Sequence, residues 1–177
     1  MGLSKKRKKI HWTRNSKCSI LTPKMRQYNP QNNCRNRSLT MKITIIDGQG
    51  GKLGALLTSA VKAEFPNAFV AAVGTNAIAT SAMLKAGADS AATGDNPAVV
   101  ACRDSNAVLG PVGIAVADSL HGEVTPKMAL AVARCPGIRI LLPINRCKTF
   151  IACEESSPTE YVRRAIITLR ENLDSNC

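Results

Sequence analysis

The stretch MKITIIDGQGGKLGALL, residues 41–57, constrains the fold of this chain more than any other feature. A β-branched run over Lys42–Ile46 predicts a short strand, and apolar residues at helical spacing predict a helix over Lys52–Glu64. The connecting turn, Gly48–Gly51, is rich in glycine. A strand, a glycine turn and a helix in immediate succession are typical of a unit in which backbone N–H groups approach a phosphate.

The same alternation continues along the chain. Further strands are predicted at 68–73, 89–92, 106–109, 138–144 and 149–153, and further helices at 77–86, 114–120 and 126–134. A last helix is predicted from the capping box Ser157-Pro158-Thr159-Glu160 and the apolar stripe that follows it. Alternating strands and helices predict an α/β fold: a Rossmann-like three-layer αβα sandwich with a mostly parallel sheet of five or six strands.

Charge divides the chain into two parts. The whole sequence of 177 residues carries a formal charge of +12, but residues 1–40 hold 11 of the 24 Lys and Arg and no Asp or Glu. Residues 41–177 therefore hold 13 basic and 12 acidic groups and are close to neutral. We expect a disordered basic arm over 1–40 and a single Rossmann-like domain over 41–177.

The basic arm has two interpretations. Taken literally, it is a candidate for binding nucleic acid or an anionic membrane. Alternatively, the arm is translated upstream sequence and the true start is Met41, because Met41 directly precedes the first strand and Arg37-Ser38 could be encoded by a ribosome-binding sequence. An Arg37 codon of the CGN type would contradict this hypothesis.

Several classes of protein are excluded by what the sequence lacks. The near-neutral domain has no general attraction for polyanions, which argues against nucleic acid as a partner of residues 41–177. The seven cysteines show no C-x-x-C spacing, so neither a zinc ribbon nor a disulfide framework is predicted. No apolar stretch is long enough to span a bilayer, and the N terminus has no secretory h-region. We expect a cytoplasmic protein.

The glycine turn only approximates a dinucleotide motif. Gly48, Gly50 and Gly54 nearly match G-x-G-x-x-G, with the third glycine displaced by one residue. An acid that could bind a ribose is expected at the end of the second strand, but that position reads Gly74-Thr75-Asn76. The sequence therefore supports NAD and NADP only weakly, and a nucleotide or another phosphorylated ligand better. A tight packing turn without a ligand is the structural alternative.

The loops after the predicted strands supply the candidate binding residues, because the carboxyl ends of parallel strands share one edge. The glycines of the first turn would shape a phosphate site, and Thr75, Asn76, Asn96 and Arg146 would orient the rest of the ligand. The full candidate set is Asp47, Gly48, Gln49, Gly50, Gly51, Gly54, Gly74, Thr75, Asn76, Thr93, Gly94, Asp95, Asn96, Gly110, Pro111, Asn145 and Arg146. Neither a metal site nor a catalytic residue is predicted.

One further motif, His121-Gly122-Glu123, matches the H-x-E of zinc deaminases. These enzymes also require P-C-x-x-C downstream, and only Cys135-Pro136 occurs here. The zinc interpretation therefore fails, and His121 is expected at the surface near a helix end.

The segments IDGQGG, GTNAIATSAMLKAGAD, ATGDN, GPVGI and LLPINRC occur here in one order. Over roughly Met41–Leu169 the chain thereby resembles a family of short bacterial proteins known only as a domain of unknown function. The resemblance implies a bacterial cytoplasmic protein with a Rossmann-like fold and brings no activity. An oligomeric enzyme, such as a homodimer, would show turnover, whereas a regulatory or structural module would not.

Overall fold

The computed structural model describes residues 41–144, 151–152 and 154–174. The chain divides into the units Met1–Arg37 and Ser38–Cys177, and the described residues belong to the second. Within it, five parallel strands form one sheet in the order β3-β2-β1-β4-β5. The strands are β1 (Lys42–Asp47), β2 (Phe69–Gly74), β3 (Ser90–Thr93), β4 (Ala107–Pro111) and β5 (Ile138–Leu142).

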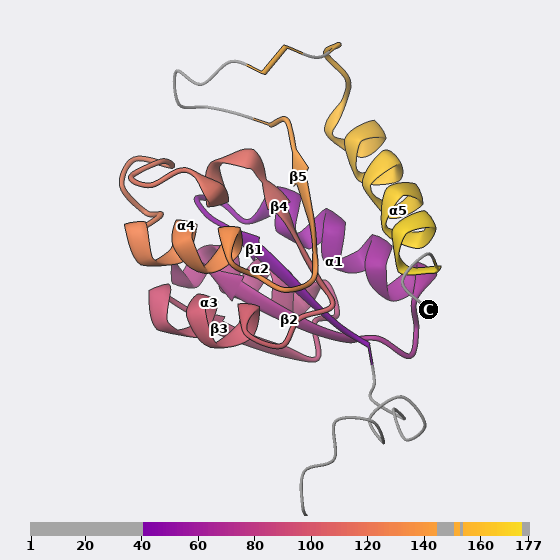
Figure 1. Cartoon of the computed structure of the whole chain (residues 1–177), viewed down its shortest axis with the longest axis horizontal. Coiled ribbons are helices and arrows are strands. Elements are labelled where there is room, and N and C mark those ends of the chain that lie inside the picture. The colour runs from indigo at the N-terminus through magenta and orange to yellow at the C-terminus, as the bar shows by residue number, and fades with distance from the viewer. Residues whose placement is uncertain (1–40, 145–150, 153, 175–177) are drawn as a thin grey trace, which may run out of the picture. The chain divides into compact units, whose positions relative to one another are not determined.

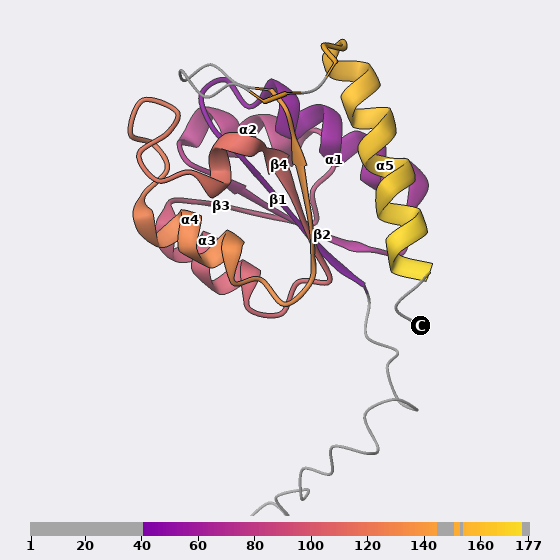
Figure 2. The same ribbon diagram turned by 45° about the horizontal axis from the view of Figure 1, so that its top comes forward.

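Helices cover both faces of the sheet (Figures 1 and 2). One face packs against α1 (Lys52–Glu64), α2 (Ala77–Lys85) and α5 (Pro158–Asp174). The other packs against α3 (Asp95–Cys102) and α4 (Pro126–Ala133). The predicted Rossmann-like α/β fold with a parallel sheet is thus confirmed.

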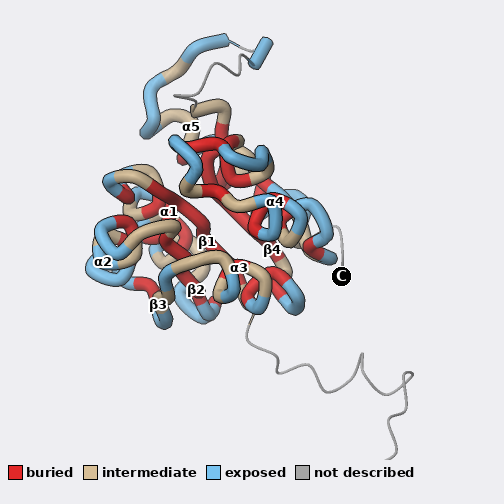
Figure 3. The backbone as a smooth tube through the Cα atoms, turned by 90° about the vertical axis from the view of Figure 1, so that its left-hand side faces the viewer, coloured by how far each residue is buried: buried red, intermediate tan, exposed pale blue. Residues whose placement is uncertain are grey.

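The central strand β1 shows why these residues form a buried sheet. Successive strand residues point to opposite faces, so Ile43 and Ile45 enter the core under α1, while Ile46 enters the core under α3 and α4. All three are fully buried. Thr44 is buried too, and its hydroxyl lies 2.5 Å from that of Ser105. In Figure 3 the central strands β1, β2 and β4 accordingly form the red interior between partly exposed helices.

Three elements differ from the predictions. A helix predicted over 114–120 is wrong: a short 3₁₀ helix, η2, spans Val112–Ala115, and left-handed residues such as Leu120 follow it. Helix α3 was not predicted, because its Asp-Asn-Pro start has the composition of a turn. Most of the sixth strand predicted at 149–153 lies outside the described residues, and Ile151 and Ala152 are not in a strand.

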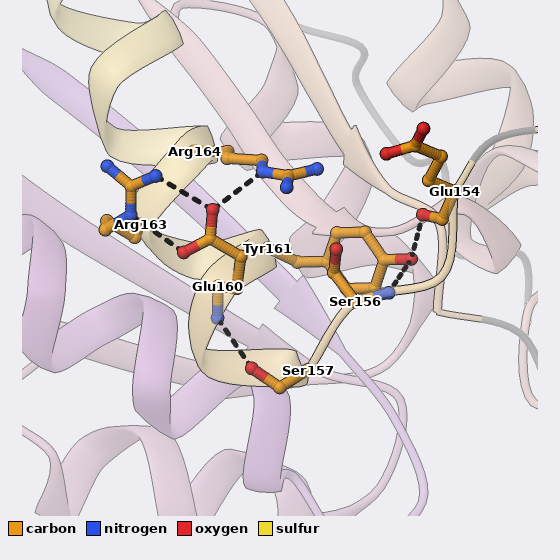
Figure 4. A network of polar contacts seen from close by, with 7 residues as sticks. All are labelled: Glu154, Ser156, Ser157, Glu160, Tyr161, Arg163 and Arg164. Atoms are coloured by element: carbon orange, nitrogen blue, oxygen red, sulfur yellow. Dashed lines mark hydrogen bonds and ion pairs between the residues drawn. The ribbon is translucent and has the colours of Figure 1, made fainter.

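The capping box at the start of α5 is half formed (Figure 4). The Ser157 hydroxyl accepts the Glu160 N–H at 3.2 Å, as predicted. The Glu160 carboxylate does not return to Ser157; it accepts hydrogen bonds of 2.8 Å from Arg163 and Arg164. Tyr161 fixes the preceding segment, since its hydroxyl accepts the Ser156 N–H at 2.9 Å and donates to the Glu154 carbonyl at 3.1 Å.

The Glu160 cluster predicts an acid-dependent stability. The hydrogen bonds from Arg163 and Arg164 lower the pKa of the Glu160 carboxyl to about 2. A group whose pKa is depressed by folding stabilises the fold above its ordinary pKa, and this contribution is lost as the pH falls. Wild type should therefore melt above Glu160→Gln at pH 6, and the difference should vanish as the pH approaches 2. Melting curves across this range test it; an unchanged difference would contradict it.

Candidate functional site

The Gly48–Gly51 turn forms as predicted between β1 and α1. The Gly51 N–H donates to the Gly48 carbonyl at 3.0 Å, and Gly51 is the N-cap of α1 in a left-handed conformation, φ +68°. Gln49 is also left-handed, with φ +50°. The turn therefore reverses the chain in four residues and begins α1 at Lys52.

The Asp47 carboxylate stabilises this turn by accepting two backbone hydrogen bonds. Its Oδ1 accepts the Gly48 N–H at 2.8 Å and its Oδ2 accepts the Gly54 N–H at 2.6 Å. The residue is only 5% exposed, and this burial raises the pKa of its carboxyl despite the two hydrogen bonds. Asp47 therefore acts as a cap within the fold and uses one of the free N–H groups of α1.

The glycines of the motif have different functions. A Cβ at Gly51 would lie 2.5 Å from the Ala79 Cα, and one at Gly54 would lie 2.5 Å from the Met83 Sδ, so both glycines allow α1 to pack closely against α2. A Cβ at Gly50 would meet nothing within 4 Å. The turn is thus a packing device at Gly51 and Gly54, and Gly50 is the glycine with open space beside it.

A cavity of about 380 Å³ lies beside the turn. It is placed at the carboxyl ends of β1 and β4, which are neighbours in the sheet although the helices after them cover opposite faces. Open α/β sheets bind ligands at such a point. The wall combines turn backbone, the start of α1 and apolar side chains: Asp47, Gly48, Gln49, Gly50, Gly51, Lys52, Leu53, Leu56, Pro111, Leu120, Ile144 and Pro158.

The predicted site residues separate into groups. Those lining the cavity are Asp47, Gly48, Gln49, Gly50, Gly51 and Pro111. Those at the ends of β2 and β3, or directly after them, do not line it: Gly74, Thr75, Asn76, Thr93, Gly94, Asp95 and Asn96. Gly54 packs inside α1, and Gly110 lies within β4 against the Ile46 carbonyl rather than in the loop. Asn145 and Arg146 lie outside the described residues.

Thr75 and Asn76, which follow β2, donate hydrogen bonds to Glu123, a contact that the sequence did not predict. The Oε2 of Glu123 accepts the Gln49 N–H at 2.8 Å, the Asn76 side-chain amide at 3.0 Å and the Thr75 hydroxyl. Burial would raise the pKa of Glu123, but these three hydrogen bonds hold it below its ordinary value. Glu123 is therefore ionised at neutral pH and ties the loop after η2 to the ends of β1 and β2.

No local sequence pattern predicts that Glu123 joins the loop after η2 to the ends of β1 and β2. In the sequence, Glu123 belongs only to the incomplete H-x-E motif, and it lies 48 positions after Thr75. The loop reaches the end of β2 because β4, which precedes it, lies beside β1 in the sheet. Among the described residues, no group of three or more His, Cys, Asp and Glu could hold a metal ion.

Comparison with known proteins gives a family but no activity. The model of one family, described as "Domain of unknown function (DUF3842)", matches residues 42–174. Searches of curated proteins and of solved structures gave no match. In the part of the chain that the structure describes, no helix is long and apolar enough to cross a membrane.

Proposed function

Because the chain belongs to the DUF3842 family, whose description carries no activity, we propose its function from its own geometry: it binds a nucleotide or another phosphorylated small molecule beside the Gly48–Gly51 turn. The observation that carries this proposal is the position of the cavity, which lies at the carboxyl ends of β1 and β4 and beside the start of α1. Its volume of about 380 Å³ lies in the range typical of small-molecule sites.

The phosphate is expected at the first turn of α1. Lys52 and Leu53 both line the cavity, and their backbone N–H groups donate to no atom of the described residues. These N–H groups and the positive end of the helix dipole favour an anion. The exposed Lys52 side chain adds a cation on the same side. Arg146, outside the described residues, remains a candidate for a second one.

The remaining wall suits a flat, weakly polar group such as a nucleobase. Leu53, Leu56, Ile144 and Pro158 supply apolar surface next to the turn. Leu56 is 44% exposed although it lies in an apolar wall, so a ligand could cover it. Ligand sites commonly combine such apolar walls with a few polar groups that fix orientation.

A panel of nucleotides and sugar phosphates tests the proposal by thermal shift. A ligand present at 100 times its dissociation constant should raise the free energy of unfolding by about 2.7 kcal/mol. Lys52→Gln should weaken binding about tenfold, the effect of one charge-assisted hydrogen bond. Lys85→Gln, on the last turn of α2 and away from the cavity, is the matched control and should bind as wild type does.

Gly50 provides the steric test. Gly50→Ala and then Gly50→Val should lower the affinity in that order, because each places more atoms beside the proposed phosphate. The Ala variant should have the same melting temperature as wild type, since its added Cβ contacts no atom within 4 Å. If no compound raises the melting temperature at millimolar concentration, or if Gly50→Val leaves affinity unchanged, the proposal is wrong.

A further inference from the structure

We infer that the Gln49 N–H, the Thr75 hydroxyl and the Asn76 side-chain amide form an oxyanion subsite, which Glu123 occupies in this structure, and that a ligand phosphate competes with Glu123 for it. The inference rests on the proposed function for its natural ligand, because Gln49 belongs to both the subsite and the cavity wall. It adds a second anion-binding position and a way to control access to the first.

The three donors converge on one atom. They come from the β1–α1 turn and from the end of β2, and all reach the Oε2 of Glu123. Donors that converge on one charged oxygen bind phosphate and carboxylate oxygens alike. The geometry is therefore that of an oxyanion site, and a side chain of the same protein supplies the oxyanion.

Much of the subsite is organised without Glu123. The Asn76 Oδ1 accepts the Ala79 N–H at 2.9 Å as the N-cap of α2, and its amide also donates to the Gln49 carbonyl at 3.0 Å. These two bonds orient the amide group of Asn76. The left-handed Gln49 is fixed by the turn, whose Gly48 carbonyl binds Gly51. The donors should thus remain in place if Glu123 leaves.

The segment that carries Glu123 is held in an unfavourable conformation. The backbone φ angles of Asp118, Leu120 and His121 are +61°, +51° and +60°, values that residues other than glycine rarely adopt. The Asp118 N–H donates to the Val124 carbonyl at 2.8 Å and closes the base of this loop. The Glu123 hydrogen bonds compensate for the strain, so exchange of Glu123 for an external phosphate would allow the loop to relax.

The same loop shapes the cavity. Leu120 lines the cavity and also lies against Gly48, where an added Cβ would approach its Cδ1 at 2.9 Å. Release of Glu123 would remove the hydrogen bonds that tie the loop carrying Leu120 to Gln49, Thr75 and Asn76. The three donors converge on a single oxygen of Glu123, so a phosphate in the same position would meet the Glu123 carboxylate with strong like-charge repulsion. Occupation by one therefore excludes the other.

The test measures the binding of inorganic phosphate to wild type, Glu123→Ala and Glu123→Gln by calorimetry and by amide chemical shifts of Gln49 and Thr75. Both variants should bind phosphate at least tenfold more tightly than wild type. Acetate, measured in parallel, shows whether a carboxylate is accepted as well. Asp118→Asn removes the same charge from the same loop without touching the subsite, and Asn tolerates a left-handed φ; it should bind phosphate as wild type does.

Equal phosphate affinity in wild type and both Glu123 variants would overturn the inference. Loss of nucleotide binding on Glu123→Gln would also overturn it, because Glu123 would then contact the ligand directly. The two proposals can fail separately. Tighter phosphate binding by Glu123→Ala, with no nucleotide stabilising any of the proteins, would support the subsite and contradict the proposed function.

Discussion

Gly51→Ala is expected to lower the free energy of unfolding by about 2–4 kcal/mol, although the substitution adds one methyl group. Two effects add at this position. The left-handed φ of +68° is costly for any residue with a Cβ. The new Cβ would also lie 2.5 Å from the Ala79 Cα and 3.0 Å from the Ala79 carbonyl oxygen, which are backbone atoms and cannot rotate away. Helices α1 and α2 would have to separate.

Gly50→Ala is the matched control, one residue earlier in the same turn. Its Cβ meets nothing within 4 Å, so stability should change by less than about 0.5 kcal/mol, as at ordinary surface positions. Urea denaturation of the two variants measures the difference. Equal stabilities would show that the turn adapts, and that the close packing of Gly51 against α2 is unimportant for the fold.

Asp47→Ala is the second substitution with a large expected effect, about 2–4 kcal/mol of unfolding free energy. It leaves the buried N–H groups of Gly48 and Gly54 without their acceptor at the start of α1. Asp47→Asn should cost less, because its amide oxygen still accepts one of the two hydrogen bonds. Asp104→Asn, which removes an exposed carboxylate paired with Lys42, should cost at most about 1 kcal/mol and serves as the control.

The pH dependence separates charge from packing at Asp47. Burial raises the pKa of its carboxyl above the ordinary value of 3.8. The unfolded chain therefore loses the Asp47 proton at a lower pH than the folded protein does. The stability of wild type relative to Asp47→Asn should fall as the pH rises from 3.8 towards the raised pKa of the folded protein. Denaturation curves from pH 3 upward measure the trend. If the free energy of unfolding of wild type instead rose relative to that of Asp47→Asn over this pH range, the two N–H hydrogen bonds would outweigh desolvation.

The order of strands and helices could be predicted because each element carries its own signal. The β-branched run at Lys42–Ile46 and the 3.6-residue periodicity of Lys52–Glu64 are local properties, and the structure confirms both elements. Helix α3 was missed because its first residues, Asp95-Asn96-Pro97, are equally suited to a turn. A helix was predicted over 114–120 from composition, but Asp118, Leu120 and His121 have left-handed backbone conformations, and Glu123 bonds to Gln49, Thr75 and Asn76, which are distant in sequence.

The sequence by itself determined the strand, turn and helix around Gly48–Gly51, because hydrogen bonds and steric limits within a few residues fix such a unit. It did not determine which glycine packs and which faces open space, since Ala79 and Met83 approach the turn from another helix. Nor did it place Glu123. Thr75, Asn76 and Glu123 meet because the sheet sets β4 beside β1 and β1 beside β2, and such adjacency arises from long-range packing, not from local sequence.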